Sequence, residues 1–435
     1  MRRTPLLLFL LLAALPIVAQ TEEARIAEAQ HIAKLTAIDP RAADDADASQ
    51  TFSHADIYTG SESPENLPWP QNVQARINRL THLPLLQTTT AAVMVYDLTA
   101  GQTIYTYNHR QLLRPASTMK VLTAVTALDV LGGSHRFATS LYYKGTIARR
   151  TLQGDLYCVG SMDPKFEGAD LNTLVNRLRQ LGIDTVRGRI VADCSLKDTL
   201  RWGEGWCWDD DNPVLSPLLV DKKSNFTSRL ASALRSQGVV LTNTVATQGR
   251  LPAGATHVGT CTHTLDDVLV RMMKESDNLY AEAVFYQIAA SNGRRPTAAR
   301  DAATLMAQRV KRMGLTPDEY RFADGSGLSL YNYVSAELQV AFLRYAWDHR
   351  KIYEHLLPTL PVAGEDGTLR RRMQGTPAGG NVQAKTGTLT GVSSLTGYCT
   401  ASNGHRLCFS IINQGVRRAA EGRQFQDRVC EALCQ

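Results

Sequence analysis

Before residue 132, hydrophobic positions recur mostly with helical spacing, interrupted by two short runs that alternate with strand spacing. This pattern predicts a helix, two strands and a long apolar helix, over Gln71–Leu83, Ala91–Tyr96, Thr103–Tyr107 and Ser117–Leu131. Pro84 and Gly132-Gly133 mark the ends of the two helices. The apolar helix has so few polar positions that we expect it to be buried on nearly every side.

Beyond residue 135 the pattern changes to short strands that alternate with helices. Strands are predicted at Ala138–Lys144, Leu152–Val159, Arg189–Ala192 and Thr242–Thr247, and helices at Leu171–Leu181 and Ser228–Ser236. We call residues 136–263 the inserted segment and expect a mixed α and β fold there. Later come helices at Thr264–Glu275, Leu279–Ala290, Thr297–Met313, Ala336–Asp348 and Glu421–Cys434, and strands at Val382–Thr388, Leu395–Thr400 and Leu407–Ile412.

The first twenty residues have the pattern of a secretory signal. Arg2 and Arg3 form a positive start, Leu6–Val18 is a short apolar run, and Ala19 fits a cleavage site. The apolar run is short for a membrane span, although a retained anchor is the alternative. We therefore expect a signal peptide at 1–19, an extension or linker at 20–68, and a periplasmic protein with at most peripheral membrane contact.

The net charge of +6 and the pI of about 8.8 come from basic residues that are spread through the chain. Because these residues form no basic stripe, the sequence gives little support to nucleic-acid binding. The charge mainly favours solubility. A length of 435 residues allows two or three domains, and the oligomeric state does not follow from the sequence.

The eight cysteines fit an oxidising compartment. Asn403-Gly404 signals a two-residue hairpin turn, and in that register Cys399 and Cys408 would face each other across two strands. Cys430 and Cys434 are one helical turn apart, and the other four thiols cannot be paired from the sequence. Since neither CxxC nor HExxH occurs, buried thiols or bridges are favoured over a metal site, and no cofactor is expected.

Three short motifs suggest a chemical activity. They are Ser117-Thr118-Met119-Lys120, Ser276-Asp277-Asn278 and Lys385-Thr386-Gly387-Thr388. The first places a hydroxyl and an amine at i and i+3, on one face of the apolar helix. Each motif alone could be a helix cap, a turn or a strand end, but the three in this order predict a serine acyl-transfer site.

A serine hydroxyl needs a base within hydrogen-bonding reach, and Lys120 can be that base if burial or a second cation lowers its pKa. Lys385 could be that cation and could also attract a substrate carboxylate. Ser276 can relay a proton and Asn278 can hold a substrate amide. Gly387 lets a substrate backbone lie against the strand, and the N–H groups of Ser117 and Thr388 could form an oxyanion hole.

The motif set resembles the penicillin-binding proteins and class A β-lactamases. Ser117 and Ser276 are 159 residues apart, more than in a compact β-lactamase. This insert resembles the low-molecular-mass class C penicillin-binding proteins, the D-alanyl-D-alanine carboxypeptidase/endopeptidases. Further segments look like that family: Gly160–Pro164, Gly188–Ser195, Trp206–Asp210, Asp324–Ser329 and Leu360–Arg370.

The resemblance covers residues 70 to 415 and implies an α/β (α+β) fold. A discontinuous penicillin-binding-protein/β-lactamase-like transpeptidase domain, 69–135 and 264–435, would carry a large mixed α/β insert at 136–263. The implied activity is hydrolysis of peptidoglycan stem peptides, terminal or cross-linked, through an acyl-enzyme on Ser117. β-Lactam antibiotics would acylate the same serine.

By the same resemblance, Lys120, Ser276, Asn278 and Lys385 are catalytic, and Thr386, Gly387, Thr388 and Asp193 bind substrate. Asp193 would hold the diaminopimelate amine. Leu330 departs from the family, which often has a basic residue there, so side-chain recognition is only half matched. A β-lactamase or esterase on this scaffold and a non-catalytic peptidoglycan-binding protein are the alternative interpretations.

Overall fold

The computed structural model describes residues 64–435. The expected signal peptide at 1–19 and the expected extension as far as residue 63 lie outside the described residues. Within the part that is described, no helix is long and apolar enough to cross a membrane.

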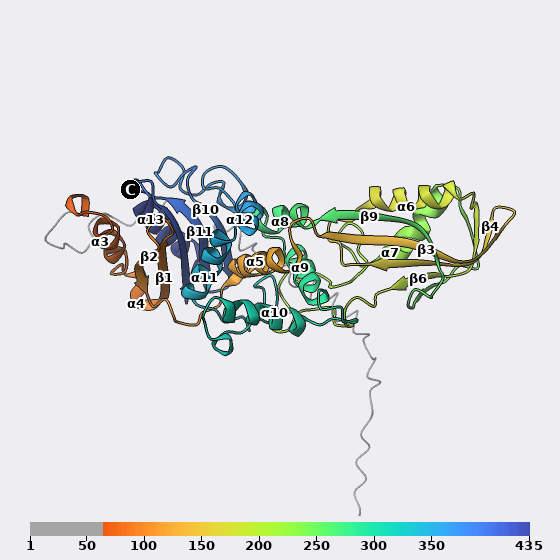
Figure 1. Ribbon diagram of the computed structural model, residues 1–435, viewed down its shortest axis with the longest axis horizontal. Coiled ribbons are helices and arrows are strands. Elements are labelled where there is room, and N and C mark those ends of the chain that lie inside the picture. Colours follow the sequence, from red (N-terminus) through yellow and green to blue (C-terminus); the bar gives the residue numbers. More distant parts are fainter. Residues whose placement is uncertain (1–63) are drawn as a thin grey trace, which may run out of the picture. The chain divides into compact units, whose positions relative to one another are not determined.

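Two ends of the chain build the first sheet, which is antiparallel and has the order β10-β11-β12-β1-β2 (Figure 1). Its strands are β1 (Thr90–Asp97), β2 (Gln102–Tyr107), β10 (Gln383–Leu389), β11 (Val392–Thr400) and β12 (Arg406–Gln414). Because β1 pairs with β12, residues more than 300 positions apart in the sequence become neighbours. The sheet lies between two apolar clusters, one on each face.

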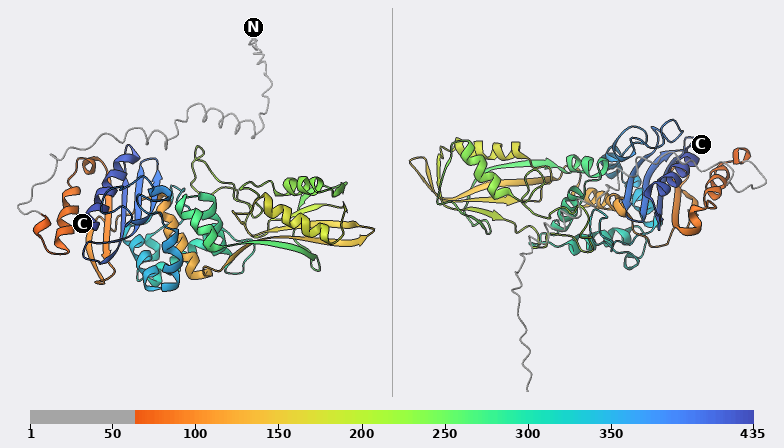
Figure 2. Two further views of the ribbon diagram at one scale, coloured as in Figure 1. Left: turned by 90° about the horizontal axis from the view of Figure 1, so that it is seen from above. Right: turned by 180° about the vertical axis from the view of Figure 1, so that it is seen from behind.

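Helices cover both faces of this sheet (Figures 1 and 2). On one face lie α3 (Gln71–Leu80), the short α4 (Leu85–Thr88) and α13 (Ala419–Cys434). The other cluster contains α5 (Met119–Leu131), α8 (Leu265–Lys274), α9 (Asn278–Ala290), α10 (Ala299–Arg312), α11 (Ala336–Asp348) and α12 (Arg350–Leu356). Helices α5 and α9 pack against each other and are buried over most of their length.

The inserted segment forms a second sheet with the order β7-β5-β4-β3-β9, in which β6 pairs with β4 and with β8. Its strands are β3 (Arg136–Ala148), β4 (Thr151–Gly160), β5 (Thr185–Arg187), β6 (Ile190–Asp193), β7 (Val240–Thr242), β8 (Ala246–Gln248) and β9 (Thr256–Thr264). Two helices, α6 (Gly168–Gln180) and α7 (Phe226–Ser236), pack on it and share a separate apolar core.

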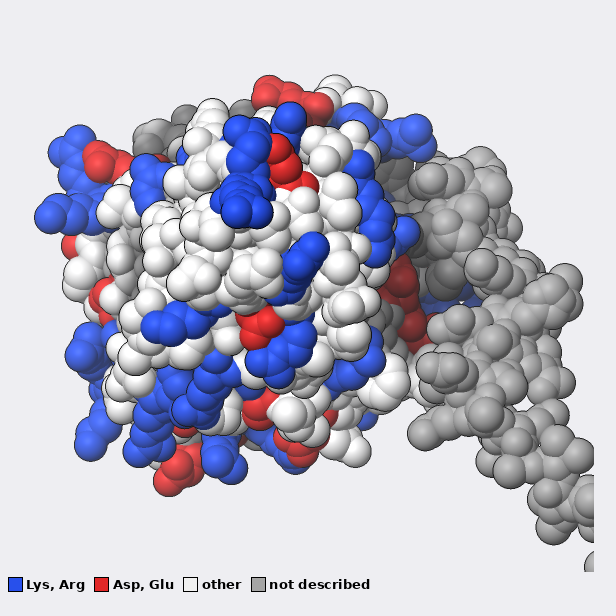
Figure 3. Space-filling view, turned by 90° about the vertical axis from the view of Figure 1, so that its right-hand side faces the viewer, with Lys and Arg blue, Asp and Glu red and all other residues white. Residues whose placement is uncertain are grey.

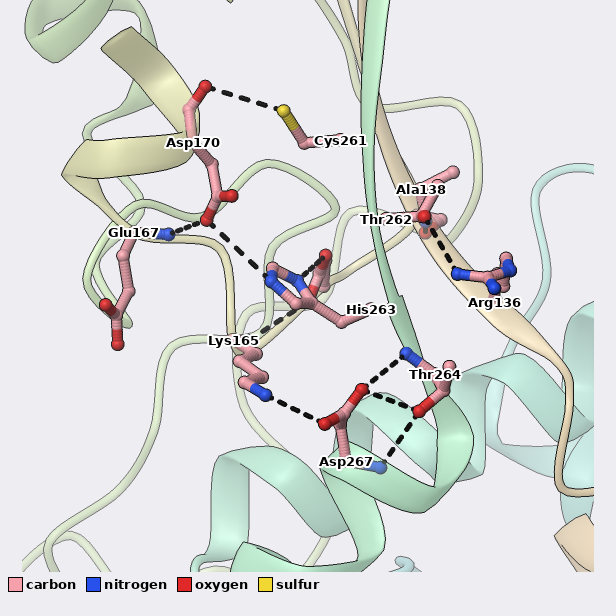
Figure 4. Close-up of polar contacts among 12 residues, drawn as sticks. Arg136, Ala138, Lys165, Glu167, Asp170, Cys261, Thr262, His263, Thr264 and Asp267 are labelled. Atoms are coloured by element: carbon pink, nitrogen blue, oxygen red, sulfur yellow. Dashed lines mark hydrogen bonds and ion pairs between the residues drawn. The ribbon is translucent and has the colours of Figure 1, made fainter. Parts of the chain in front are cut away.

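Strand β9 leads directly into α8 through a cluster of polar contacts (Figure 4). Thr264 and Asp267 form a capping box at the start of α8. The imidazole of His263 lies between two carboxylates, with Nδ1 2.8 Å from Asp163 and Nε2 3.9 Å from Asp170. These contacts join the end of β9 to the loop after β4 and to α6.

Charged side chains of both signs are interspersed on the face shown in Figure 3, and Lys and Arg side chains form no continuous stripe there. This distribution agrees with the sequence, in which the basic residues are spread through the chain. This face therefore lacks the continuous basic stripe that is typical of polyanion-binding proteins.

The main elements confirm the sequence pattern, and the differences have local causes. Helix α11 has the expected bounds, Ala336–Asp348. The expected strand Thr242–Thr247 is instead two short strands, because Asn243 adopts a positive φ of 55° between them. The pattern missed β5, β9 and the seven-residue α12, which are short or have few buried positions.

The expected pairing of Cys399 with Cys408 is wrong. Cys399 lies opposite Leu407, and Cys408 lies opposite Tyr398. The hairpin loop has one residue more than a two-residue turn, with Gly404 at a φ of 84° and the Ala401 N–H donating to the His405 carbonyl. A shift of one residue sends a side chain to the other face of the sheet, and the two cysteines belong to different apolar clusters.

Candidate active site

The nucleophile candidate Ser117 lies in a tight turn just before α5. A short 3-10 helix, Ala116–Thr118, precedes α5, and Ala116 has a φ of 48°. Such a backbone conformation is unfavourable for alanine and is held by neighbouring packing. Gly327 supplies that packing, because a Cβ at this position would lie 1.8 Å from the Ala116 carbonyl oxygen. Only glycine fits against the turn that presents Ser117.

The side chain of Lys120 is fully buried and has three polar neighbours. Its Nζ lies 2.9 Å from Ser117 Oγ, 2.8 Å from Asn278 Oδ1 and 2.8 Å from the Ser326 carbonyl oxygen. Two of these atoms can only accept hydrogen bonds. In a neutral amine they therefore take both N–H groups, which leaves the nitrogen lone pair for the Ser117 hydroxyl proton.

The pKa of Lys120 is lowered to about 8, chiefly because burial disfavours its ammonium form. The carboxylates of Asp324, Glu282 and Asp277 oppose this effect. A lysine whose pKa lies near the working pH is neutral for part of the time and can still hold a proton. An amine of this kind, 2.9 Å from Ser117 Oγ, could accept the proton of a serine hydroxyl.

The second motif lies at the start of α9. Asp277 is the N-cap residue, and its carboxylate accepts from the backbone N–H groups of Leu279 and Tyr280. Asn278 is the first residue of the helix, which places its amide at Lys120. Ser276 precedes the cap with a φ of 60°. Helix capping thus fixes the direction of the whole motif.

Lys385 on β10 also contacts the second motif, at Ser276. Its Nζ lies 2.9 Å from Ser276 Oγ and 2.7 Å from the Thr386 carbonyl oxygen. Burial, and then repulsion from Lys120, hold the pKa of Lys385 well below its usual value. The structure thus brings Ser117, Lys120 and Asn278 into one set of contacts and joins Lys385 to Ser276, with the two lysines close enough to repel each other.

The remaining residues of the third motif line the same strand. Thr386 donates its hydroxyl to Thr368 Oγ1, and Thr388 is exposed. At Gly387, a Cβ would lie 2.8 Å from the Pro115 carbonyl oxygen and 2.9 Å from the Ser117 N. The structure thus places the Ser117 turn against this glycine, and the contact of Gly387 with a substrate backbone stays a prediction.

Two buried acidic groups lie around this set; sequence reasoning placed Asp324 only within a family-like segment and did not single out Glu282. Asp324 is 1% exposed and accepts from the Gly327 and Ser329 backbone N–H groups. It also accepts from Trp206 Nε1 of the inserted segment, at 2.8 Å. Glu282 is 2% exposed in the otherwise apolar helix α9. A single charged residue within so apolar a helix was the available signal.

Asp193 lies at the end of β6 in the inserted segment and is 6% exposed. Its two carboxylate oxygens accept from the backbone N–H groups of Ser195 and Leu251. It also lines an open cavity of about 920 Å³. None of these contacts reaches the three motifs, and its role in substrate binding stays a prediction. At Leu330, the carbonyl oxygen accepts from Arg114 Nε at 3.1 Å.

Two relatives of this chain are named as D-alanyl-D-alanine carboxypeptidases. The enzyme of Actinomadura sp. is 29% identical over 437 aligned residues, which cover 78% of this chain and 80% of the relative. The D-alanyl-D-alanine carboxypeptidase DacB of Haemophilus influenzae is 25% identical over 398 residues, which cover 72% and 83%.

Solved structures have the same fold. Penicillin binding protein 4 (dacB) of H. influenzae matches with a TM-score of 0.75 and 24% identity, covering 82% of this chain and 99% of that one. A second structure of that protein, in complex with a β-lactam, matches with a TM-score of 0.67 and 25% identity, covering 83% and 100%. A predatory endopeptidase of Bdellovibrio bacteriovorus matches with a TM-score of 0.53 and 19% identity, covering 78% and 91%.

These matches confirm the expected fold class and the family resemblance. The match to the family described as D-Ala-D-Ala carboxypeptidase 3 (S13) spans residues 73–222 and 215–434, which include all three motifs. This chain therefore belongs to the S13 family of D-Ala-D-Ala carboxypeptidases.

Proposed function

We propose that this protein hydrolyses D-Ala-D-Ala bonds, terminal or cross-linked, in peptidoglycan stem peptides through an acyl-enzyme on Ser117, and that β-lactams acylate the same serine. The observation that carries this proposal is the placement of Lys120 Nζ, 2.9 Å from Ser117 Oγ and held by two carbonyl acceptors. Family membership supplies the reaction class.

In the acylation step, neutral Lys120 takes the hydroxyl proton while Ser117 Oγ bonds to the carbonyl carbon of the penultimate D-alanine. The N–H groups of Ser117 and Thr388 stabilise the oxyanion. The tetrahedral intermediate then breaks its C–N bond. The proton passes from Lys120 through the Ser276 hydroxyl to the leaving amine, and D-alanine departs.

Deacylation repeats these steps with water as the nucleophile, and it releases the shortened peptide and free Ser117. Lys385 would receive the terminal carboxylate of the substrate, with Thr386 and Thr388 beside it. A substrate carboxylate beside Lys385 would favour the ammonium form that burial and then Lys120 disfavour in the free enzyme. Asn278 would hold a substrate amide.

We further propose that residues 69–135 and 264–435 form the catalytic domain and that 136–263 is an insert packed near its cleft. The two separate sheets support this division, as does the apolar core that α6 and α7 share with the second sheet. Export by a signal peptide at 1–19 would place the enzyme in the periplasm, where its peptidoglycan substrate lies. The proposed steps use only side chains, backbone N–H groups and water.

Replacing Ser117 with alanine tests the proposal. The Ser117→Ala variant should neither be labelled by a fluorescent penicillin nor release D-alanine from a stem pentapeptide. Ser228→Ala is the matched control, because this serine lies on α7 and donates to the Asn225 carbonyl. Undiminished labelling or D-alanine release by Ser117→Ala would remove this serine from the mechanism. Slow turnover of the bound penicillin would further separate a peptidase from a β-lactamase.

A further inference from the structure

Helix α9 buries one carboxyl group, that of Glu282, one turn beyond Asn278. Every other residue from Leu279 to Ala290 is apolar, apart from Gln287 and two tyrosines. A buried carboxyl group is costly unless it is hydrogen-bonded and compensated by charge. The position of Glu282 therefore requires an explanation in terms of its contacts.

Those contacts lead directly to Lys120. Glu282 Oε1 accepts from the backbone N–H of Gly325 at 3.1 Å and from that of Ser326 at 2.8 Å. The carbonyl oxygen of the same Ser326 lies 2.8 Å from Lys120 Nζ. Ser326 thus donates its N–H to the Glu282 carboxyl group and accepts a hydrogen bond from the Lys120 amine at its carbonyl oxygen. This carbonyl is one of the two acceptors that direct the amine toward Ser117.

Glu282 and Lys120 also affect each other electrostatically. Burial, and then Asp324, raise the pKa of Glu282 to about 8 against the opposing effects of the Ser326 contacts and Lys120. In turn, the Glu282 carboxylate raises the pKa of Lys120 against burial. The two groups are therefore coupled, with residue Ser326 between them.

We propose that Glu282 is a positioning residue for the catalytic base: it fixes the Ser326 carbonyl that orients Lys120, and its charge stabilises the Lys120 ammonium after proton transfer. The inference rests on the proposed function of Lys120 as base, and it extends that function to a residue outside the three motifs. Glu282 itself touches no reacting atom.

The elements packed against Glu282 leave few other groups to account for such an effect. Lys120 faces it from α5, and Asp324 faces it from the turn before α11. Tyr286 on α9 lies within its electrostatic reach. The α8 and α10 residues that pack on α9 are mostly apolar, and the buried Arg309 of α10 is paired with Asp129. Asp277 caps the helix and acts on Lys120 as well.

Two substitutions separate the two parts of the proposal. Glu282→Gln keeps an oxygen that can accept from both backbone N–H groups but removes the charge. Glu282→Ala removes both. Gln287→Met is the matched control, because Gln287 is 5% exposed on the same helix and its amide donates to the distant Ser161 carbonyl.

The assay is the second-order rate of acylation by a fluorescent penicillin, measured from pH 5.5 to 9.5 on full-length protein. Glu282→Gln removes the negative charge that Glu282 carries once it ionises near pH 8, and losing this charge destabilises a nearby ammonium, so the upper part of the rising limb should move to lower pH. Its plateau should fall less than roughly threefold. In Glu282→Ala the plateau should fall at least roughly tenfold, because the Ser326 carbonyl is no longer held.

A titration of lysine side chains labelled with ¹³C at Cε gives a readout that does not require activity. The Lys120 signal, assigned by its loss in Lys120→Arg, should titrate at a lower pH in Glu282→Gln than in the wild type. If the rising limb of the pH profile and the Lys120 titration of Glu282→Gln both stay at the wild-type pH, the proposed effect of the Glu282 charge is overturned. A Glu282→Ala plateau equal to that of Gln287→Met would overturn the positioning part. Failure of Ser117→Ala to abolish labelling would instead refute the proposed function.

Discussion

Replacing Gly387 with alanine tests whether the third motif holds the nucleophile turn in place. Gly387 lies on β10 directly opposite Ser394 on β11. A Cβ there would lie 2.2 Å from Ser394 Oγ, 2.8 Å from the Pro115 carbonyl oxygen and 2.9 Å from the Ser117 N. Two of these three atoms belong to the backbone, so they cannot rotate away as the end of a flexible side chain could.

The size of the effect follows from these distances. The two backbone contacts are about half an ångström shorter than an ordinary van der Waals contact, so strand and turn must separate by about that amount. Overpacking of this kind costs about 1–3 kcal/mol of stability. Because a misplacement of about 1 Å can slow catalysis roughly 100-fold, about half that shift should slow acylation roughly tenfold.

The measurement is the rate at which a fluorescent penicillin labels Ser117, together with the thermal midpoint of unfolding. Gly168→Ala is the control, because Gly168 begins α6 and the nearest atom to its added Cβ is the end of the Arg229 side chain, at 3.3 Å. The control should keep wild-type labelling. If Gly387→Ala were labelled as fast as the wild type, the turn would not depend on this glycine.

Three further predictions concern the base, the insert and the hairpin. The rate of acylation should rise roughly tenfold per pH unit below pH 8 and level off above it, because the proposed base Lys120 acts only when neutral and its pKa is about 8. A flat pH profile would contradict the role of Lys120 as base. Trp206→Phe removes a hydrogen bond to the buried Asp324 carboxylate and should cost about 1.5–3 kcal/mol in urea unfolding, whereas an unchanged midpoint would make that bond unimportant. Peptide mapping without reduction should find no Cys399–Cys408 disulfide, and its detection would refute the observed register.

Much of the site could be predicted because its chemistry is local in sequence. The spacing of Ser117 and Lys120 alone predicted that they lie together, and the apolar character of the helix that follows already indicated a buried amine. The distant motifs could be grouped only through the family resemblance. The periodicity of the hydrophobic positions does not predict that α9 and β10 meet at α5.

The missed features depend on three-dimensional contacts. The hairpin register changed because the loop contains one additional residue, and a dipeptide signal does not determine loop length. The contact of Gly387 with the Ser117 turn could not be predicted, because the two are about 270 residues apart in sequence. Glu282 and Asp324 become visible as a pair only when the turn before α11 packs on α9.

The buried charges explain why a lysine can serve as the base in this site. A pKa near the ordinary 10.5 would leave Lys120 protonated, and a much lower one would leave it neutral but too weak to take a proton from serine. Burial pulls the value down, and Asp324 and Glu282 pull it back up. These acids come from a turn and from α9, whereas the serine and lysine come from α5 and the turn before it. The spacing of Ser117 and Lys120 therefore places the amine beside the hydroxyl, and the packing of other elements determines whether the amine can act as a base.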